Sequence, residues 1–150
     1  MEIKDLNKFI KLIKNLTPDT KPLWGIMSTQ HMIEHLILAV QQSNGKLTVE
    51  CFNSSEKLPM LKRYLMSNRP LPQGFVNPYI GEGLLPLIFS NLEEAITELE
   101  KEVNDYYDFF DENPDAKLTN VTFGELEKDE WIIFHEKHFT HHFKQFELVK

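Results

Sequence analysis

The sequence predicts an all-α protein, an antiparallel four-helix bundle with a long irregular connection between its second and third long helices. Four stretches repeat apolar residues with the period of an amphipathic helix, and none of the segments between them shows a convincing strand pattern. The 150 residues suit one domain with its own core, and no change in composition marks a second. We therefore expect residues 1–150 to form a single helical-bundle domain.

The first two helices are predicted over residues 3–16 and 28–43. The first places five apolar residues on one face and lysines on the other. The second follows Ser28, a plausible N-cap, and ends before Asn44-Gly45. Because its apolar residues lie on nearly all sides, we expect this helix to be buried in the bundle.

The third long helix is expected to begin after Ser90, which forms a capping-box pattern with Glu93, and to end at Asn113-Pro114. Its apolar residues alternate in spacings of four and three, which is typical of a bundle seam: Leu92, Ile96, Leu99, Val103, Tyr106 and Phe110. The fourth helix is predicted over residues 127–146. The connection between the second and third long helices is expected to hold a short helix near Leu58–Met66 and a long loop from Pro70 to Pro86.

Charge and composition disfavour several classes of partner. The net charge is -7 and no Lys/Arg-rich run occurs, so neither nucleic acid nor an anionic membrane surface is expected as a partner. Cys51 is the sole cysteine, which excludes an intrachain disulfide and suits a reducing compartment. The N-terminus lacks the apolar run of a secretion signal, and the densest apolar stretch, residues 84–89, is too short to span a bilayer. We expect a cytoplasmic protein.

All six histidines fall in two of the predicted helices. His31 and His35 lie on the second, and His135, His138, His141 and His142 lie on the fourth. Residues four apart share a helix face, so His138 and His142 present two imidazoles side by side. If the two helices pack together, one imidazole of the second helix completes a three-histidine metal site.

Three protein ligands with an open position are typical of a catalytic zinc-type site. Imidazole also suits Ni, Fe and Cu, so the residues alone leave the metal open. The competing interpretation is that the histidines only pack and form hydrogen bonds. His31 competes with His35 as third ligand. His135 and His141 lie toward the edge of the inward stripe, where each could support a ligand or face a substrate, although an ordinary packing role is favoured.

Other candidates are weaker. Cys51 has no histidine near it in sequence, and we expect it not to act as a nucleophile. The aromatic residues 106–110 are expected in the core, and the acidic stretch 93–102 is expected to be a solvated helix face. There is no glycine-rich phosphate loop and no nucleophile elbow.

Two segments resemble the DinB/YfiT-like superfamily. The segment from Trp24 to His35 is similar to its second-helix motif, in which a Trp and a Ser precede the helix and a ligand histidine follows the Ser by seven residues. His35 holds that position. The segment from Lys137 to Gln145 is similar to its closing motif, two ligand histidines four apart and a Gln three residues later; His138, His142 and Gln145 match.

The sequence also departs from the superfamily's patterns. Residues 120–126, followed by Trp131, resemble one small and mostly uncharacterised branch, whose members usually begin this segment with His-Pro. Here Asn120 and Val121 stand instead. Phe143 replaces an Arg that is common after the second ligand in other branches. Any role of those residues cannot be transferred to this chain.

The resemblance implies a four-helix bundle, often dimeric, with a divalent metal such as Zn or Ni on His35, His138 and His142. Relatives of known activity use the metal to activate a low-molecular-weight thiol for transfer or isomerisation, and others are classed as hydrolases. The leading hypothesis is therefore a thiol-dependent transferase acting on a small electrophile bound under the loop from Pro70 to Pro86. Gln145 is expected either to orient a ligand histidine through its other ring nitrogen or to serve only as a packing residue.

Two alternatives remain open. In a metal-dependent hydrolase, the general base would be Glu34, His31 or His141. In a non-catalytic, dimeric metal- or ligand-binding module, a fourth protein ligand, His31 or His135, would close the site.

Overall fold

The structure is a computed structural model that describes residues 4–73 and 84–150. This part of the chain is mostly helical, as expected, with one small antiparallel sheet. Its helices are α1 (Asn7–Ile13), α2 (Thr29–Ser43), α3 (Leu58–Met66), α4 (Leu92–Glu112) and α5 (Lys128–Gln145), and its strands are β1 (Leu118–Asn120) and β2 (Gly124–Leu126). The expectation that no strand lies between the helices was wrong.

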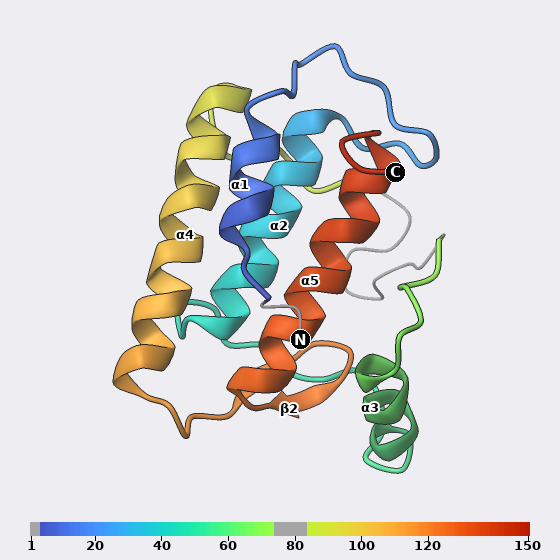
Figure 1. Cartoon of the computed structure of the whole chain (residues 1–150), viewed down its shortest axis with the longest axis vertical. Helices are drawn as coiled ribbons and strands as arrows, with labels where there is room; N and C mark the ends of the chain where they lie inside the picture. Colours follow the sequence, from blue (N-terminus) through green and yellow to red (C-terminus); the bar gives the residue numbers. More distant parts are fainter. Residues whose placement is uncertain (1–3, 74–83) are drawn as a thin grey trace.

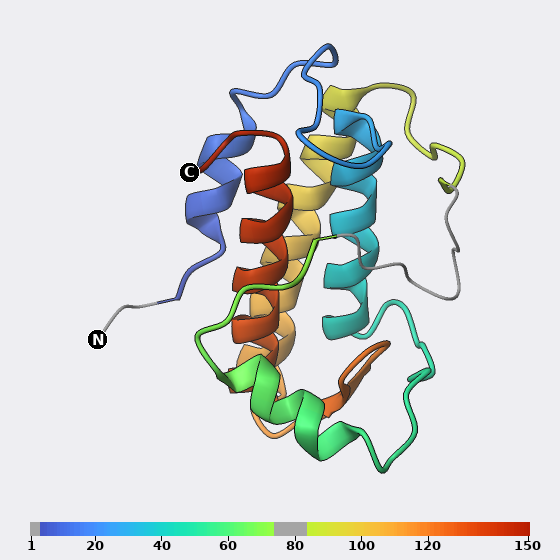
Figure 2. The same cartoon turned by 90° about the vertical axis from the view of Figure 1, so that its right-hand side faces the viewer.

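Four helices, α1, α2, α4 and α5, lie side by side along the long axis of the molecule (Figures 1 and 2). The short helix α3 lies at one end, next to the β-hairpin, and packs against α5. The core fills the space between the long helices, and its largest fully buried side chains include Trp131, Phe110 and Phe139. This arrangement brings the histidine-bearing helices α2 and α5 into contact.

Helix α2 forms as the sequence predicts. The Ser28 hydroxyl accepts a hydrogen bond from the backbone N–H of His31 at 3.1 Å, which satisfies one of the free donors of the first turn. The apolar residues on several sides of the helix are buried, among them Met32, Ile33 and Leu36, each at 0% exposure. The prediction of a buried second helix is therefore confirmed.

The start of α4 differs from the expectation. Asn91, not Ser90, is the N-cap, and its side chain accepts from the backbone N–H of Glu94 at 2.9 Å. The amide side chain therefore takes the place expected of the serine hydroxyl, one residue further along. Of the predicted seam only Ile96 is not fully buried.

Glu102 corrects the expectation of a fully solvated acidic face on α4. Its side chain is buried and accepts hydrogen bonds from Asn44 Nδ2, Lys46 Nζ and Gln41 Nε2 at 3.0, 2.7 and 2.7 Å. These donors lie in the last turn of α2 and just beyond it. A buried charge is tolerated when it is paired in this way, so Glu102 fixes the end of α2 against α4.

The hairpin before α5 is built on Asn120. Its buried side-chain carbonyl accepts from the backbone N–H groups of Thr122 and Phe123 at 2.8 and 3.0 Å, which closes an Asx-type turn. The strands pair Leu118 with Leu126 and Asn120 with Gly124. Asn120 thus has a structural role in this chain.

Helix α5 begins after its N-cap Glu127, which forms a capping box with Glu130, and ends at Gln145, so each end lies within a residue of the predicted bounds. Helix α3 matches its predicted bounds, whereas α1 is shorter than expected at both ends. Of the predicted loop from Pro70 to Pro86, residues 74–83 lie outside the described residues. None of the helices in the described ranges is long and apolar enough to cross a membrane.

Candidate metal centre

Three histidines from two helices converge on one point. His35 of α2 and His138 and His142 of α5 each offer a ring nitrogen, and these three atoms all lie within 4.8 Å of one another. The Nε2 atom of His138 lies 2.9 Å from His35 Nε2 and 3.2 Å from His142 Nε2. The four-residue spacing on α5 therefore aligns two imidazoles, and the packing of α2 against α5 supplies the third.

The spacing of these nitrogens suits a first-row metal ion. With metal–nitrogen distances of about 2.0–2.1 Å, tetrahedral geometry places two ligand nitrogens roughly 3.3–3.4 Å apart. The observed separations about His138 Nε2 depart from this by only a few tenths of an ångström. His35 and His142 are separated by up to 4.8 Å, so rotations of these side chains and of the turns that carry them would bring the three nitrogens to ligand distance. The donor set then fits a divalent ion.

Gln145 holds the ring of His142 in a defined tautomer. Gln145 Nε2 donates to the backbone carbonyl of Trp24 at 2.8 Å, so its Oε1 is the atom that lies 2.7 Å from His142 Nδ1. An amide oxygen only accepts, and His142 must therefore carry its proton on Nδ1. This leaves the lone pair of His142 Nε2 directed at the other two histidines, as the ligand role requires.

The backbone around Trp24 is shaped to reach Gln145. Leu23 N–H donates to the Gln145 backbone carbonyl at 2.7 Å. Gly25 adopts a left-handed conformation with φ +81°, and a Cβ at this position would lie 2.9 Å from Gln145 Nε2. A side chain at residue 25 would therefore both strain the backbone and displace the amide that orients His142.

His138 lies at the centre of the group, with its ring tilted against Phe134 at a centroid distance of 5.2 Å. Its Nδ1 atom is buried and has no hydrogen-bond partner among the described residues. Only Nε2 of this ring therefore has polar neighbours, and both are histidine nitrogens. The nitrogens of His35 and His142 cannot both form a good hydrogen bond with His138 Nε2 through a single proton. A metal ion at this point would instead accept the lone pair of each nitrogen.

Burial keeps the three histidines neutral at neutral pH. Desolvation, reinforced by neighbouring histidines, lowers the pKa of His35 to about 4 and that of His142 to about 3. The pKa of His138 is also well below its ordinary value, chiefly through burial and secondly through His142. Since a metal binds the neutral imidazole, the free site is already in the protonation state that binding requires.

The other histidines do not join this group. His31 Nδ1 lies 2.6 Å from the Ser28 hydroxyl, so His35 and not its competitor His31 faces α5. His135 is fully buried, and its Nε2 lies 2.7 Å from Ser43 Oγ. Ser43 donates its own proton to the Val40 carbonyl at 2.7 Å and must accept from His135. Neither His31 nor His135 is placed as a fourth ligand.

His141 lies beside the group. Its ring meets the ring of His142 edge-on at a centroid distance of 4.9 Å and that of Trp24 at 5.5 Å. The side chain is partly exposed, unlike those of His138 and His142. His141 is therefore a partly exposed neighbour of the three ligands, next to His142.

Glu34, the residue before His35, is already engaged. Its two carboxylate oxygens accept from the backbone N–H groups of Ile88 and Phe89 at 2.7 and 3.2 Å. Gln30 Nε2 donates to the same side chain at 2.9 Å. A buried carboxylate whose two oxygens already accept hydrogen bonds is poorly placed to act as a general base. Of the three candidates for that role, Glu34 is therefore disfavoured.

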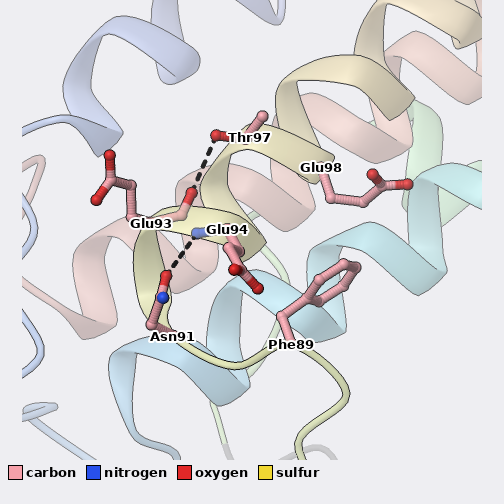
Figure 3. Close-up of a pocket in the computed structure, with 6 residues that line it drawn as sticks. All are labelled: Phe89, Asn91, Glu93, Glu94, Thr97 and Glu98. Atoms are coloured by element: carbon pink, nitrogen blue, oxygen red, sulfur yellow. Dashed lines mark hydrogen bonds between the residues drawn. The ribbon is translucent and has the colours of Figure 1, made fainter.

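Two hollows on the surface of the described residues are not lined by the three histidines. One, of about 530 Å³, is formed at the start of α4 by Phe89, Asn91 and four residues of the first two turns, and none of the histidines lines it (Figure 3). Another, of about 670 Å³, lies between α1 and α5. Cys51 is not part of the histidine group either. Its thiol donates to the Thr122 carbonyl at 3.5 Å, in the turn of the hairpin.

We compared the chain with family models, curated proteins and solved structures, and none matched it. The assignment of the site therefore depends on the geometry of its own residues.

One residue near the site was not predicted from the sequence. Lys137 immediately precedes the ligand His138, and its ammonium donates to three backbone carbonyls at and beyond the end of α3. The helical period gives only the direction of Cβ, and a long aliphatic stem can carry the charge elsewhere. No signal in the sequence points to this contact.

The stability of the metal-free protein is expected to fall in mild acid. Burial lowers the pKa of His135 to about 3, against about 6.5 in the unfolded chain. The unfolded state binds the additional proton between these values, so this stabilisation is complete above pH 6.5 and is lost as the pH falls toward 3. One such histidine contributes up to about 1.4 kcal/mol per pH unit.

Urea denaturation at pH 5, 6 and 7 in the presence of a chelator measures this dependence. His135→Leu is expected to reduce the slope of unfolding free energy against pH by up to about 1.4 kcal/mol per pH unit, which corresponds to one proton. Carboxylates titrate alike in both proteins and serve as the internal reference. Equal slopes would show that His135 is not held neutral by the fold.

Proposed function

We propose that this protein is a metal-dependent enzyme of the DinB/YfiT-like kind, with a four-helix bundle that carries Zn or Ni on His35, His138 and His142. The observation that carries the proposal is the convergence of three neutral imidazole nitrogens, one of them oriented by Gln145. The ion would act as a Lewis acid that stabilises the anion of a thiol or of water near neutral pH. A homodimer in the cytoplasm is part of the same proposal.

The reaction that we propose is transfer of a low-molecular-weight thiol to a small electrophile. The thiol releases its proton to solvent, its sulfur forms a bond to the electrophilic carbon, and the leaving group departs with the bonding electron pair. Once the thiol is ionised, this step needs no general base from the protein. That suits a site in which Glu34 and the Nδ1 of His31 are already hydrogen-bonded.

Hydrolysis is the second candidate, and the position of His141 favours it. A water nucleophile benefits from a nearby base, and of the three residues considered for that role His141 alone borders the ligand histidines while remaining partly exposed. The non-catalytic module has less support, since neither His31 nor His135 is placed to close the site.

Turnover assays with metal-loaded protein test the proposal. Zn- or Ni-loaded protein is expected to accelerate conjugation of 1-chloro-2,4-dinitrobenzene with cysteine, glutathione or coenzyme A, with His142→Ala as the matched control. Thiol-independent cleavage of p-nitrophenyl acetate, lost in His141→Gln, would favour hydrolysis instead. Rates that do not differ between wild type and His142→Ala in either assay would exclude both enzymatic proposals for these substrates.

A further inference from the structure

Lys137 fastens the segment that follows α3 onto α5. Its ammonium donates to the backbone carbonyls of Ser67 and Arg69 at 2.7 and 2.6 Å, and more weakly to that of Tyr64 at 3.4 Å. The ammonium also lies over the Tyr64 ring, 5.6 Å from its centroid. The Tyr64 hydroxyl donates to the Pro70 carbonyl. One cation therefore organises residues 64–70 at the point where they meet α5.

Beyond this contact the same segment continues along α5 toward the histidines. Figure 2 shows residues 67–73 passing in front of α5 in that view. The backbone of Leu71 lies close enough to the His141 side chain to oppose the lowering of its pKa by burial, and the Leu71 side chain packs on the core. The segment held by Lys137 thus borders the side of the centre where His141 is exposed.

Glu34 fastens the segment that precedes α4 onto α2. Its carboxylate accepts from two consecutive backbone N–H groups, those of Ile88 and Phe89. Gln30 completes the contact, because its Nε2 donates both to Glu34 and to the Phe89 carbonyl, the latter at 2.7 Å. Ile88 is 72% exposed, so apolar burial of its side chain does not hold this segment in place.

The two anchors share a position relative to the metal centre. Lys137 immediately precedes His138, and Glu34 immediately precedes His35. Each anchor therefore belongs to the same helical turn as a ligand, although its side chain points elsewhere. A rotation of either turn that brings a ligand nitrogen to an ion would also move the anchor and the segment bound to it.

We propose that Lys137 and Glu34 are positioning residues of the metal centre, which fasten residues 67–71 and 88–89 to the turns that carry His138 and His35. Occupancy of the centre and order in these two segments are then coupled. Coupling of this kind is reciprocal. If the metal stabilises the ordered form of a segment by a given factor, loss of that order lowers the affinity for the metal by the same factor. This inference rests on the proposed metal site and assigns it two further residues.

Amide hydrogen exchange and zinc affinity together test the coupling. In wild-type protein, zinc is expected to slow exchange of amides in residues 67–71 and 88–89 by about tenfold, within the usual range of coupling between sites. Lys137→Met keeps the length of the side chain and removes its donors. It is expected to abolish the zinc-dependent slowing in residues 67–71 and to raise the zinc Kd about tenfold. Glu34→Gln is expected to do the same for residues 88–89.

Matched controls separate coupling from general loosening. Lys144→Met and Glu93→Gln change exposed residues of α5 and α4 and should leave both readouts at the wild-type values. Lys137→Arg, which keeps charged donors, should retain most of the coupling. If Lys137→Met does not fold, Glu34→Gln decides the question by itself.

Two results would overturn the inference in distinguishable ways. Faster exchange by equal factors with and without zinc, at unchanged zinc Kd, would make the anchors merely structural while leaving the metal site intact. Absence of zinc binding in wild-type protein, with His142→Ala indistinguishable from it, would remove the metal site and the coupling together.

Discussion

Replacing His138 by alanine is expected to reduce bound zinc from about one ion per chain to background. His138 supplies the central nitrogen, within 3.2 Å of both other ring nitrogens, so its loss leaves two ligands on separate helices. Substitution of a residue that only orients a ligand costs about 10–100-fold in metal affinity, and loss of a ligand should cost more. Metal analysis of protein dialysed against zinc measures the effect.

A graded series makes this result specific. Gln145→Leu removes the acceptor for His142 Nδ1 and is expected to lower the affinity for zinc by about 10–100-fold without abolishing binding. His31→Ala removes the imidazole one turn before His35, which lies outside the three-histidine group, and should leave the zinc content unchanged. Equal zinc content in His138→Ala and His31→Ala would refute the three-histidine site.

Trp131→Ala is expected to cost about 3–5 kcal/mol of unfolding free energy, the usual range for truncation of a buried tryptophan. The side chain is fully buried, its ring stacks on His135 at a centroid distance of 5.3 Å, and its Nε1–H donates to the Leu118 carbonyl at 3.2 Å. It therefore joins α5 to the hairpin. Truncation creates a cavity and also leaves a strand carbonyl without its donor.

Urea denaturation of metal-free protein measures this cost, which separates folding from metal binding. Ile88→Ala serves as the control, because that apolar side chain is 72% exposed and its truncation should change stability by no more than about 0.5 kcal/mol. A loss below about 1 kcal/mol in Trp131→Ala would mean that the hairpin and the start of α5 do not depend on this side chain.

Long periodic segments were predictable from the sequence, whereas short ones were not. Helices α2, α4 and α5 carry enough apolar repeats to fix their positions within one or two residues. The strands have three residues each, too few for an alternating pattern to be recognised. The hairpin depends on the Asn120 side chain, which binds backbone groups two and three residues further on.

The candidate site could be predicted in part. The spacing of His138 and His142 follows from the helical period, and the resemblance selected His35 over His31. The structure gives a physical reason to favour His35. The Nδ1 of His31 is hydrogen-bonded to the Ser28 hydroxyl at the start of α2, so that His31 is held away from the other two ligands. The contacts of Lys137 and Glu34 depend on how chain segments far apart in sequence pack, and neither periodicity nor residue type contains that information.

The paired hydrogen bonds between residues 23–24 and Gln145 have a consequence for protein engineering. Surface connections usually accept insertions, since their backbone is solvated and free to move. The connection before α2 is different: Leu23 N–H and the Trp24 carbonyl both bind Gln145, and Gln145 in turn orients His142. An added residue between Lys21 and Gly25 would shift this register and misalign a ligand, whereas the exposed residues 54–57 offer a safer position for a tag or a fused domain.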